Sequence, residues 1–263
     1  AARYLQQGAV SYLYYADRLN QLPLGLIGIG VGTAILPALS RQIGSGNESA
    51  AKETQNRAIE LALFLSLPAA VALCVAATPL IRGLLQHGVF TAQDTIGAAS
   101  ALAVFSLGVP AYVLIKVLTP GFYARQDTKT PVRVALFSML FNLVGNLILI
   151  WPLGHVGVAA ATAFSAWVNV IILYWLLHRD DHLQADTRLL SRGARIIAAS
   201  AVMGVALWFM GPYSDHYMAG SFLTRVIALS LLCGGGALVY AVAIFGLGAY
   251  RLSELKALIT RRK

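Results

Sequence analysis

The sequence predicts an all-α polytopic membrane protein, and two observations carry this prediction. Of the 263 residues, 58% are hydrophobic and only 12% are charged, whereas soluble domains carry about 25% charged residues. The charges are also unevenly spread, because short charged connectors separate long uncharged runs. About 20 apolar residues in a helix span a bilayer core of roughly 30 Å, so each long run is a candidate transmembrane helix.

Six uncharged runs are long enough for one membrane helix each. They are residues 61–81, 96–115, 134–154, 156–177, 196–214 and 226–250. A large soluble helical core is the alternative, but helices in such a core have one polar face. These runs are apolar all round, which favours membrane helices.

A seventh membrane segment, residues 8–40, contains several helix breakers, among them Pro23, Gly25 and Pro37. As one straight helix it would be about 50 Å long, which exceeds the thickness of the bilayer core. We therefore predict a broken or bent helix, with the break near Pro23-Leu24-Gly25 and with Pro23 and Gly25 as hinge residues. The glycines of the stretch GLIGIGVG, residues 25–32, are expected to allow close helix packing.

Lys and Arg residues collect on alternate connectors. Sixteen of the 20 lie in connectors 41–57, 116–133 and 179–195 and in the tail 251–263, and three lie on the opposite side. By the positive-inside rule, these four regions are predicted to be cytoplasmic, the C-terminus included, and residue 1 is predicted to lie outside. A chain that starts there without a signal peptide is expected to be the C-terminal portion of a longer protein.

The net charge of +9 follows from this topology. Basic connectors contact the anionic lipids of the inner leaflet, so membrane lipids are predicted partners and nucleic acid is not. In the tail, Leu252, Leu255, Leu258 and Ile259 share one helical face, which is typical of an amphipathic helix on the membrane surface. A frayed terminus is the alternative.

Neither an enzyme nor a metal site is predicted. Cys74 and Cys233 fall inside predicted membrane segments and are interpreted as packing residues, and the five histidines show no metal-ligand spacing. The sequence contains no phosphate-binding glycine loop and no nucleophile motif. We therefore expect no cofactor, and the residues do not discriminate between a coupling ion and the membrane potential as the energy source.

Polar residues inside the membrane segments are candidate functional residues, because burying charge in hydrocarbon costs several kcal/mol. Asn142 and Asn146 lie four residues apart on one helix face. This predicts hydrogen bonds between helices, with the lining of a polar cavity as the alternative. Lys116 lies near the end of its run, from which its side chain can extend to the membrane surface.

Arg18 is the one Lys or Arg residue that the positive-inside count assigns to neither side of the membrane. If its helix starts at residue 19, Arg18 lies at the outer rim. If the helix starts near residue 8, Arg18 lies inside and needs a water-filled cavity or an anionic partner. Asp17 is a poor partner, because neighbouring helical residues point about 100° apart. The residues alone leave both alternatives open.

Three stretches resemble the MurJ (MviN) family of bacterial lipid II flippases, and the similarity covers essentially the whole chain. They are SYLYYADRLNQLPLGLIGIGVGTAILPALSRQ, LLQHGVFTAQDT and LTPGFYARQDTKTPVRVA. Members of this family have about fourteen membrane spans, so the resemblance implies that this chain is the C-terminal half, and the missing N-terminal half is an expected partner. It also implies a multidrug/oligosaccharidyl-lipid/polysaccharide exporter-like fold, with two helical lobes around a central cavity.

The activity that the resemblance implies is transport rather than catalysis. Such proteins move undecaprenyl-diphosphate-linked peptidoglycan precursor (lipid II) from the inner to the outer leaflet of the bacterial plasma (inner) membrane by alternating access. Ser11, Asp17 and Arg18 match the cavity motif of the family, and a guanidinium suits a diphosphate. This chain has Asn20-Gln21 where many members carry a glutamate, which puts an acidic switch at this place in doubt.

The resemblance also divides the chain. Residues 1–178 would form the second transporter lobe, with five spans, and residues 179–195 a cytoplasmic connector. Residues 196–250 would form two additional spans that hold the lipid tail, and residues 251–263 a cytoplasmic basic tail.

Two other functions are weighed against this one. Another lipid-linked oligosaccharide or a drug could be the substrate within the same superfamily, but a drug-cation exporter should carry acidic residues in its spans, where this sequence has Asp17 alone. A membrane-embedded transferase would need clustered His, Asp or Glu at an interface, and the sequence shows no such cluster.

Overall fold

The computed structural model describes residues 8–217, 220 and 222–249, and all regular structure in this part of the chain is helical. The predicted all-α fold is confirmed. In chain order the helices are α1 (Ala9–Pro23), the π-helix η1 (Leu24–Gly28), α2 (Ile29–Gly44), α3 (Glu48–Val75), α4 (Ala77–Leu85), α5 (Ala92–Ser106), α6 (Val109–Tyr123), α7 (Lys129–Leu153), α8 (His155–Arg179), α9 (Thr187–Tyr217) and α10 (Phe222–Gly246).

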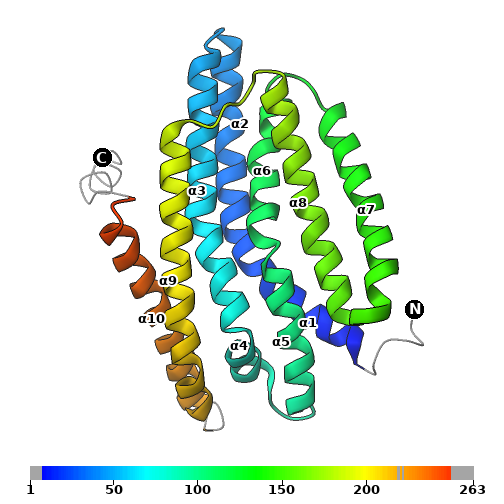
Figure 1. Ribbon diagram of the computed structural model, residues 1–263, viewed down its shortest axis with the longest axis vertical. Helices are drawn as coiled ribbons and strands as arrows, with labels where there is room; N and C mark the ends of the chain where they lie inside the picture. Colours follow the sequence, from blue (N-terminus) through cyan, green and yellow to red (C-terminus); the bar gives the residue numbers. More distant parts are fainter. Residues whose placement is uncertain (1–7, 218–219, 221, 250–263) are drawn as a thin grey trace.

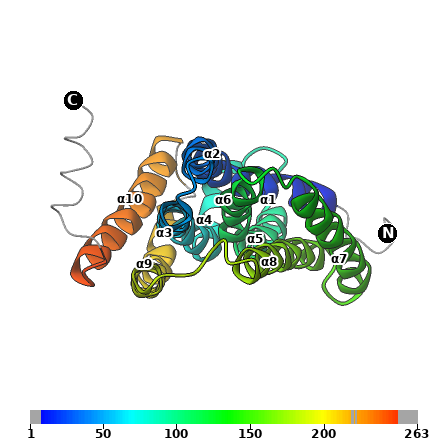
Figure 2. The ribbon, with the colours of Figure 1, turned by 90° about the horizontal axis from the view of Figure 1, so that it is seen from above.

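The helices run roughly along the long axis of the molecule, and α7 and α10 form its two edges (Figure 1). Figure 2 shows the bundle from above, with α2 on one side and α8 and α9 on the other. Three apolar clusters hold the bundle together. The first mainly joins α2, α3, α6 and α8, the second α1, α4, α5 and α8, and the third α3, α9 and α10. The last two helices therefore pack on the rest of the bundle mainly through α3.

The predicted break in the first membrane segment is confirmed. Helix α1 ends at Pro23, and the π-helix η1 follows before α2 continues the same segment. Proline lacks an N–H group and its ring clashes with the carbonyl one turn earlier, which explains why the α-helical hydrogen bonding changes at this residue. The segment crosses the whole molecule, from α1 at the lower end to α2 at the upper end (Figure 1).

Within the described residues, six helical segments are long and apolar enough to cross a membrane. They are Glu48–Val75, Ala92–Tyr123, Lys129–Leu153, His155–Arg179, Thr187–Tyr213 and Leu223–Gly246. These segments correspond to the six predicted uncharged runs. Helices α1 and α2 contain only 15 and 16 residues, so neither spans alone, and only together with η1 do they form the seventh predicted segment.

The second predicted run is not one continuous helix, because the chain bends between α5 and α6. A Cβ at Gly108 would lie 3.1 Å from the backbone of Ala163 in α8, a tight contact that the absence of a side chain at this position avoids. The indole Nε1 of Trp167 donates a hydrogen bond of 2.9 Å to the carbonyl of Leu107. This carbonyl at the bend thus has a hydrogen-bond partner from α8. Pro110 is at the first turn of α6, where proline is favoured.

Helix α9 begins at Thr187. The arginine-rich residues before the uncharged run 196–214 are therefore the first turns of this helix. The loop between α8 and α9 is therefore only residues 180–186. The tail 251–263, for which an amphipathic helix is expected, lies outside the described residues.

Three of the four regions that were predicted to be cytoplasmic lie at one end of the bundle, which we call the basic end (residues 41–57, 125–133 and 180–195). Lys116, which was counted with the second of them, lies inside α6 instead, and the tail 251–263 is outside the described residues. Lys52 Nζ lies 2.9 Å from a carboxylate oxygen of Asp181. A guanidinium nitrogen of Arg125 lies 2.5 Å from a carboxylate oxygen of Glu48. Because these ion pairs join three connectors at the same end, the chain crosses the bundle out and back, an even number of times, between one of these connectors and the next.

Candidate functional site

Helix α1 has one exposed face, and this face carries two of the predicted site residues. Ser11, Tyr14 and Arg18 are exposed, whereas Tyr12 and Ala16 are buried against the bundle. Residues spaced by three and four positions share one side of a helix. The structure therefore places Ser11 and Arg18 on the same side of α1, two turns apart.

Arg18 lies inside α1 rather than at its start. The helix begins at Ala9, so Arg18 is about 14 Å along it at 1.5 Å per residue. This agrees with the alternative in which the helix starts near residue 8. The guanidinium carbon lies 4.9 Å from the ring centroid of Tyr14, a cation–π contact that leaves the charge unneutralised. No carboxylate within the described residues forms an ion pair with Arg18.

Asp17 is half-buried and is not on the same side of the helix as Arg18. Its carboxylate accepts a hydrogen bond from the side-chain amide of Gln21, one turn further along α1. Asn20 is buried at 2% exposure, and within the described part of the chain its Oδ1 has no hydrogen-bond partner. Asn20 and Gln21 therefore lie in different surroundings, Asn20 buried in the bundle and Gln21 exposed beside Asp17.

The glycines around the break differ in what they do. A Cβ at Gly28 would lie 2.8 Å from Cδ of Lys116, and one at Gly32 would lie 3.3 Å from the backbone oxygen of Lys116. At Gly25 a Cβ would meet nothing within 4 Å. Close packing is therefore confirmed for Gly28 and Gly32 against α6, whereas the hinge role of Pro23 and Gly25 stays a prediction.

A cavity of about 570 Å³ lies beside this contact, between α2 and α6. Lys116 is the only charged residue among the described residues that line it. The other lining residues include Gly28, Gly32 and Pro37 from the broken segment and Tyr123 at the end of α6. Lys116 is half-buried and the methylene groups of its side chain pack against Gly28. Its side chain is therefore more constrained than one that only extends to the membrane surface.

Asn142 and Asn146 lie on the side of α7 that faces α8. The amide nitrogen of Asn142 donates a 3.3 Å hydrogen bond to Thr162 Oγ1 of α8, and that of Asn146 donates a 3.0 Å hydrogen bond to Asn142 Oδ1. Asn146 Oδ1 is buried and has no hydrogen-bond partner within the described residues. The pair joins two helices, and whether it also lines a polar cavity stays a prediction.

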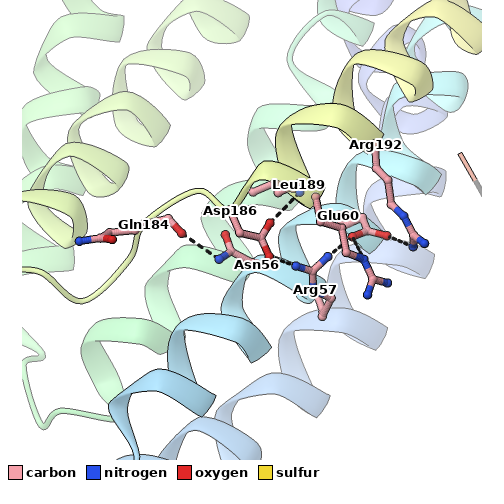
Figure 3. A network of polar contacts seen from close by, with 8 residues as sticks. Asn56, Arg57, Glu60, Gln184, Asp186, Leu189 and Arg192 are labelled. Carbon is pink, nitrogen blue, oxygen red and sulfur yellow. Dashed lines mark hydrogen bonds and ion pairs between the residues drawn. The ribbon is translucent and has the colours of Figure 1, made fainter.

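A group of charged residues at the basic end is one that the sequence analysis missed. We call Arg57, Glu60, Asp186, Arg188 and Arg192 the Glu60 cluster. Glu60 is buried in α3, and its carboxylate lies 2.5 Å from Arg57 Nη1, 2.7 Å from Arg192 Nη1 and 3.5 Å from Arg188 Nε. Figure 3 shows Arg57 between Glu60 and Asp186. Arg57 forms a second ion pair with Asp186.

The Glu60 cluster joins α3 to the start of α9. Asp186 Oδ1 accepts a 2.6 Å hydrogen bond from the backbone N–H of Leu189 and so caps α9, while the amide of Asn56 donates to the carbonyl of Gln184 at 2.8 Å (Figure 3). Acidic residues were expected to avoid the spans apart from Asp17, but α3 begins at Glu48 and Glu60 lies well inside it. The spacing Arg57-x-x-Glu60 just before an uncharged run is the signal that could have revealed it.

No group of three or more His, Cys, Asp or Glu within the described residues could hold a metal ion. The polar side chains that the structure exposes on α1 are a guanidinium, two hydroxyls and an amide (Arg18, Ser11, Tyr14 and Gln21), all of which can donate hydrogen bonds to an anion.

Comparison with known sequences agrees with the family resemblance. The sequence model of the family described as "Lipid II flippase MurJ" matches residues 1–228. A protein of Rhizobium meliloti (strain 1021) named "Probable lipid II flippase MurJ" is 40% identical over 261 residues, which cover 97% of this chain and 48% of that protein. A Vibrio cholerae protein of the same name is 40% identical over 257 residues, which cover 97% of this chain and 49% of that protein. The chain thus spans about half the length of these curated relatives.

Two solved structures have a similar fold. A structure titled "Lipid II flippase MurJ, inward closed conformation" matches with a TM-score of 0.72 and 27% identity, covering 90% of this chain and 47% of that one. A MOP superfamily transporter from Pyrococcus furiosus matches with a TM-score of 0.56 and 21% identity, covering 91% of this chain and 56% of that one. The second likeness concerns the fold alone.

Proposed function

The chain belongs to the MurJ family of lipid II flippases, and we propose that it forms the C-terminal half of a transporter that moves lipid II from the inner to the outer leaflet of the bacterial plasma membrane. The match to about half the length of its relatives supports a second lobe that works with a first one. In such transporters the two halves move against each other around a fixed central site.

The observation that carries this proposal is the exposed face of α1. It presents Arg18, which no carboxylate within the described residues neutralises, and Ser11 two turns away. An arginine offers planar N–H groups that bind diphosphate oxygens in charge-assisted hydrogen bonds. Lipid II carries a diphosphate next to its lipid chain, so a cation exposed on a membrane helix is where we place its headgroup.

Other features support the same transporter. The π-helix between α1 and α2 supplies an irregular segment at which the two halves of the helix can bend, with Pro23 and Gly25 as hinge residues. Asp17 would act through its hydrogen bond to Gln21 rather than on the substrate. The basic end would face the cytoplasm, together with the C-terminus, because basic residues remain on that side of bacterial inner membranes.

The deciding experiment is carried out in cells whose own flippase is depleted. These cells receive a full-length protein that contains this chain and the half that the relatives have before it, and lipid II is measured separately in each leaflet. We expect lipid II to reach the outer leaflet. If it continues to accumulate in the inner leaflet while the protein is present in the membrane, the proposal is wrong, and another lipid-linked oligosaccharide or a drug is then tested as substrate.

Arg18→Ala tests the site itself. Loss of hydrogen bonds to a charged group costs about 1.5–3 kcal/mol, so we expect transport to fall by about tenfold or more, with partial activity in Arg18→Lys. Arg133→Ala is the matched control, because Arg133 is an exposed arginine at the basic end of α7 and not on α1. Full transport by Arg18→Ala would show that Arg18 only extends to the membrane surface.

A further inference from the structure

Tyr12 is next to Ser11 in the sequence, but its side chain points about 100° away around α1 and is buried, whereas Ser11 is exposed. Its side chain is 6% exposed and lies in the apolar cluster that joins α1 to α5. A Cβ at Gly97 of α5 would lie 2.6 Å from two carbons of the Tyr12 ring, a separation that real Cβ atoms do not show. The ring therefore fits against α5 only because residue 97 is glycine.

The hydroxyl of Tyr12 is held by a carboxylate that α5 itself fixes. It donates a hydrogen bond of 2.7 Å to Asp94 Oδ1. The other carboxylate oxygen of Asp94 accepts hydrogen bonds from the backbone N–H and the hydroxyl of Thr91, at 2.8 and 2.7 Å. Thr91 and Asp94 form the capping box at the start of α5, a rigid arrangement in which both side chains satisfy free N–H groups. Tyr12 is thus bonded to a fixed point rather than to a flexible side chain.

Helix α8 also contacts the Tyr12 ring. The ring of His155, at the start of α8, lies edge-on to the Tyr12 ring with centroids 5.5 Å apart. Its Nε2 lies 3.0 Å from the carbonyl oxygen of Gly97 and 3.4 Å from Ser100 Oγ. We call Tyr12, Asp94, Gly97, Ser100 and His155 the Tyr12 cluster. It joins α1, α5 and α8 at the end of the bundle opposite the basic end.

This attachment determines which way α1 faces. Successive residues of an α-helix turn by about 100°, so fixing Tyr12 against α5 also fixes the directions of Ser11 and Arg18. Helix α2 follows α1 only through the π-helix η1, in which the hydrogen-bonding pattern changes. The contacts that α1 itself makes with α5 and α8 therefore also fix its rotation, and among the described residues Tyr12 makes the one side-chain hydrogen bond from α1 to another helix.

We propose that Tyr12 is a positioning residue for transport, because the Tyr12 cluster holds α1 in the rotation that turns Ser11 and Arg18 toward the substrate. This inference rests on the function proposed above, in which Arg18 binds the diphosphate. Tyr12 acts through the orientation of α1 and does not contact the substrate.

The first test replaces one hydroxyl. Tyr12→Phe keeps the ring on Gly97 and removes only the hydrogen bond to Asp94. Tyr15→Phe is the matched control, because it makes the same change one turn along α1, where the Tyr15 hydroxyl forms no hydrogen bond within the described residues. In the full-length protein we expect Tyr12→Phe to lower transport by about threefold to tenfold and Tyr15→Phe to leave it unchanged.

The second test measures the rotation of α1 directly. Single cysteines are placed at exposed Ser11 and at fully buried Ala16, with Cys74 and Cys233 replaced, and both are reacted with a charged thiol reagent. With native Tyr12 we expect labelling at position 11 and little at position 16. Tyr12→Phe should lower the first rate and raise the second. Gly97→Ala, which displaces the ring and keeps the hydroxyl, should change the labelling in the same direction.

The outcomes separate this inference from the proposed function. If Arg18→Ala is inactive but Tyr12→Phe and Gly97→Ala transport and label like the native protein, Tyr12 is not a positioning residue and the function stands. Reduced transport with unchanged labelling also overturns the inference, because α1 has then not turned. If the full-length protein leaves lipid II in the inner leaflet, the proposed function fails. If Arg18→Ala transports normally, the assignment of Arg18 to the diphosphate fails. In both cases the labelling ratio alone still reports whether Tyr12 orients α1.

Discussion

The two ends of the bundle are held together by different chemistry. At the basic end, the Glu60 cluster joins α3 to α9 with a buried carboxylate that contacts three arginines. At the opposite end, the Tyr12 cluster joins α1 to α5 and α8 through one tyrosine hydroxyl, one carboxylate and one imidazole. The first junction consists mainly of ionised groups, and the second consists mainly of neutral donors and packed rings.

This difference determines how easily each junction can open. Removing one partner of a buried ion pair leaves a charge without compensation, so such a junction separates only at a large cost in free energy. The hydrogen bond from the neutral Tyr12 hydroxyl to the Asp94 carboxylate contributes less, about 1.5–3 kcal/mol. The ion pairs therefore attach α9 to α3 more strongly than the Tyr12 hydrogen bond attaches α1, which carries Arg18, to α5.

The strongest test of this comparison removes the central charge of the Glu60 cluster. Glu60→Gln keeps the shape of the side chain but removes the negative charge that contacts Arg57, Arg188 and Arg192. Arg57 keeps its second ion pair with Asp186. We expect the free energy of unfolding in detergent to fall by about 3–5 kcal/mol, as for other broken buried pairs. Glu53→Gln is the control, because Glu53 is exposed on the same helix. Equal effects of the two substitutions would mean that the basic end is not held by its buried charge.

A smaller effect is expected at the start of α9. Asp186 both caps α9 through Leu189 and pairs with Arg57. Asp186→Ala removes both interactions and should lower the free energy of unfolding by about 1–2 kcal/mol. Asp186→Asn retains a good helix cap and loses only the ion pair, so it should cost less. If the two variants are equally destabilised in denaturant unfolding, the cap contributes nothing and the ion pair alone holds this end of α9.

The helical architecture could be predicted from the sequence because it depends on composition along the chain. Uncharged runs specified the membrane helices, and Pro23 marked the break that η1 fills. The bend at Gly108 was missed, since its cause is the close approach of Ala163 from α8. Such an approach depends on tertiary packing, which no local pattern contains.

The candidate site was predictable in part. The spacing of Ser11 and Arg18 was enough to place them on one side of a helix, and their exposure agrees with that. Arg57 is a local partner of Glu60 that the spacing could have revealed. Arg192, another of its partners, and Asp94, the partner of Tyr12, were not predictable because they lie far away in the sequence. A contact between residues that are distant in the chain becomes visible only when the helices are packed.

The smallest predicted effect concerns the pH dependence of the basic end. His182 lies in the loop between α8 and α9, and its pKa is below the ordinary value of 6.5, first because the ring is partly desolvated and second because Arg125 is near. Lys52 acts in the same direction, whereas Glu48 and Asp180 oppose it. The folded chain therefore binds this proton less tightly than the unfolded chain does. As the pH falls below about 6.5, the unfolded state gains a proton that the folded state does not, so the free energy of unfolding decreases.

Thermal unfolding in detergent between pH 7.5 and 5.5 measures this effect. The pKa values of Asp180 and Asp181 are lowered by hydrogen bonds from Arg179 and Lys52, so these carboxylates titrate below this range. We expect the midpoint to fall toward pH 5.5 and His182→Asn to reduce the fall, with His87→Asn, near the opposite end, as the control. A fall that His182→Asn leaves unchanged would assign the titration to another group. If His87→Asn instead removes the fall in the unfolding midpoint, the end of the bundle opposite the basic end is the one that responds to pH.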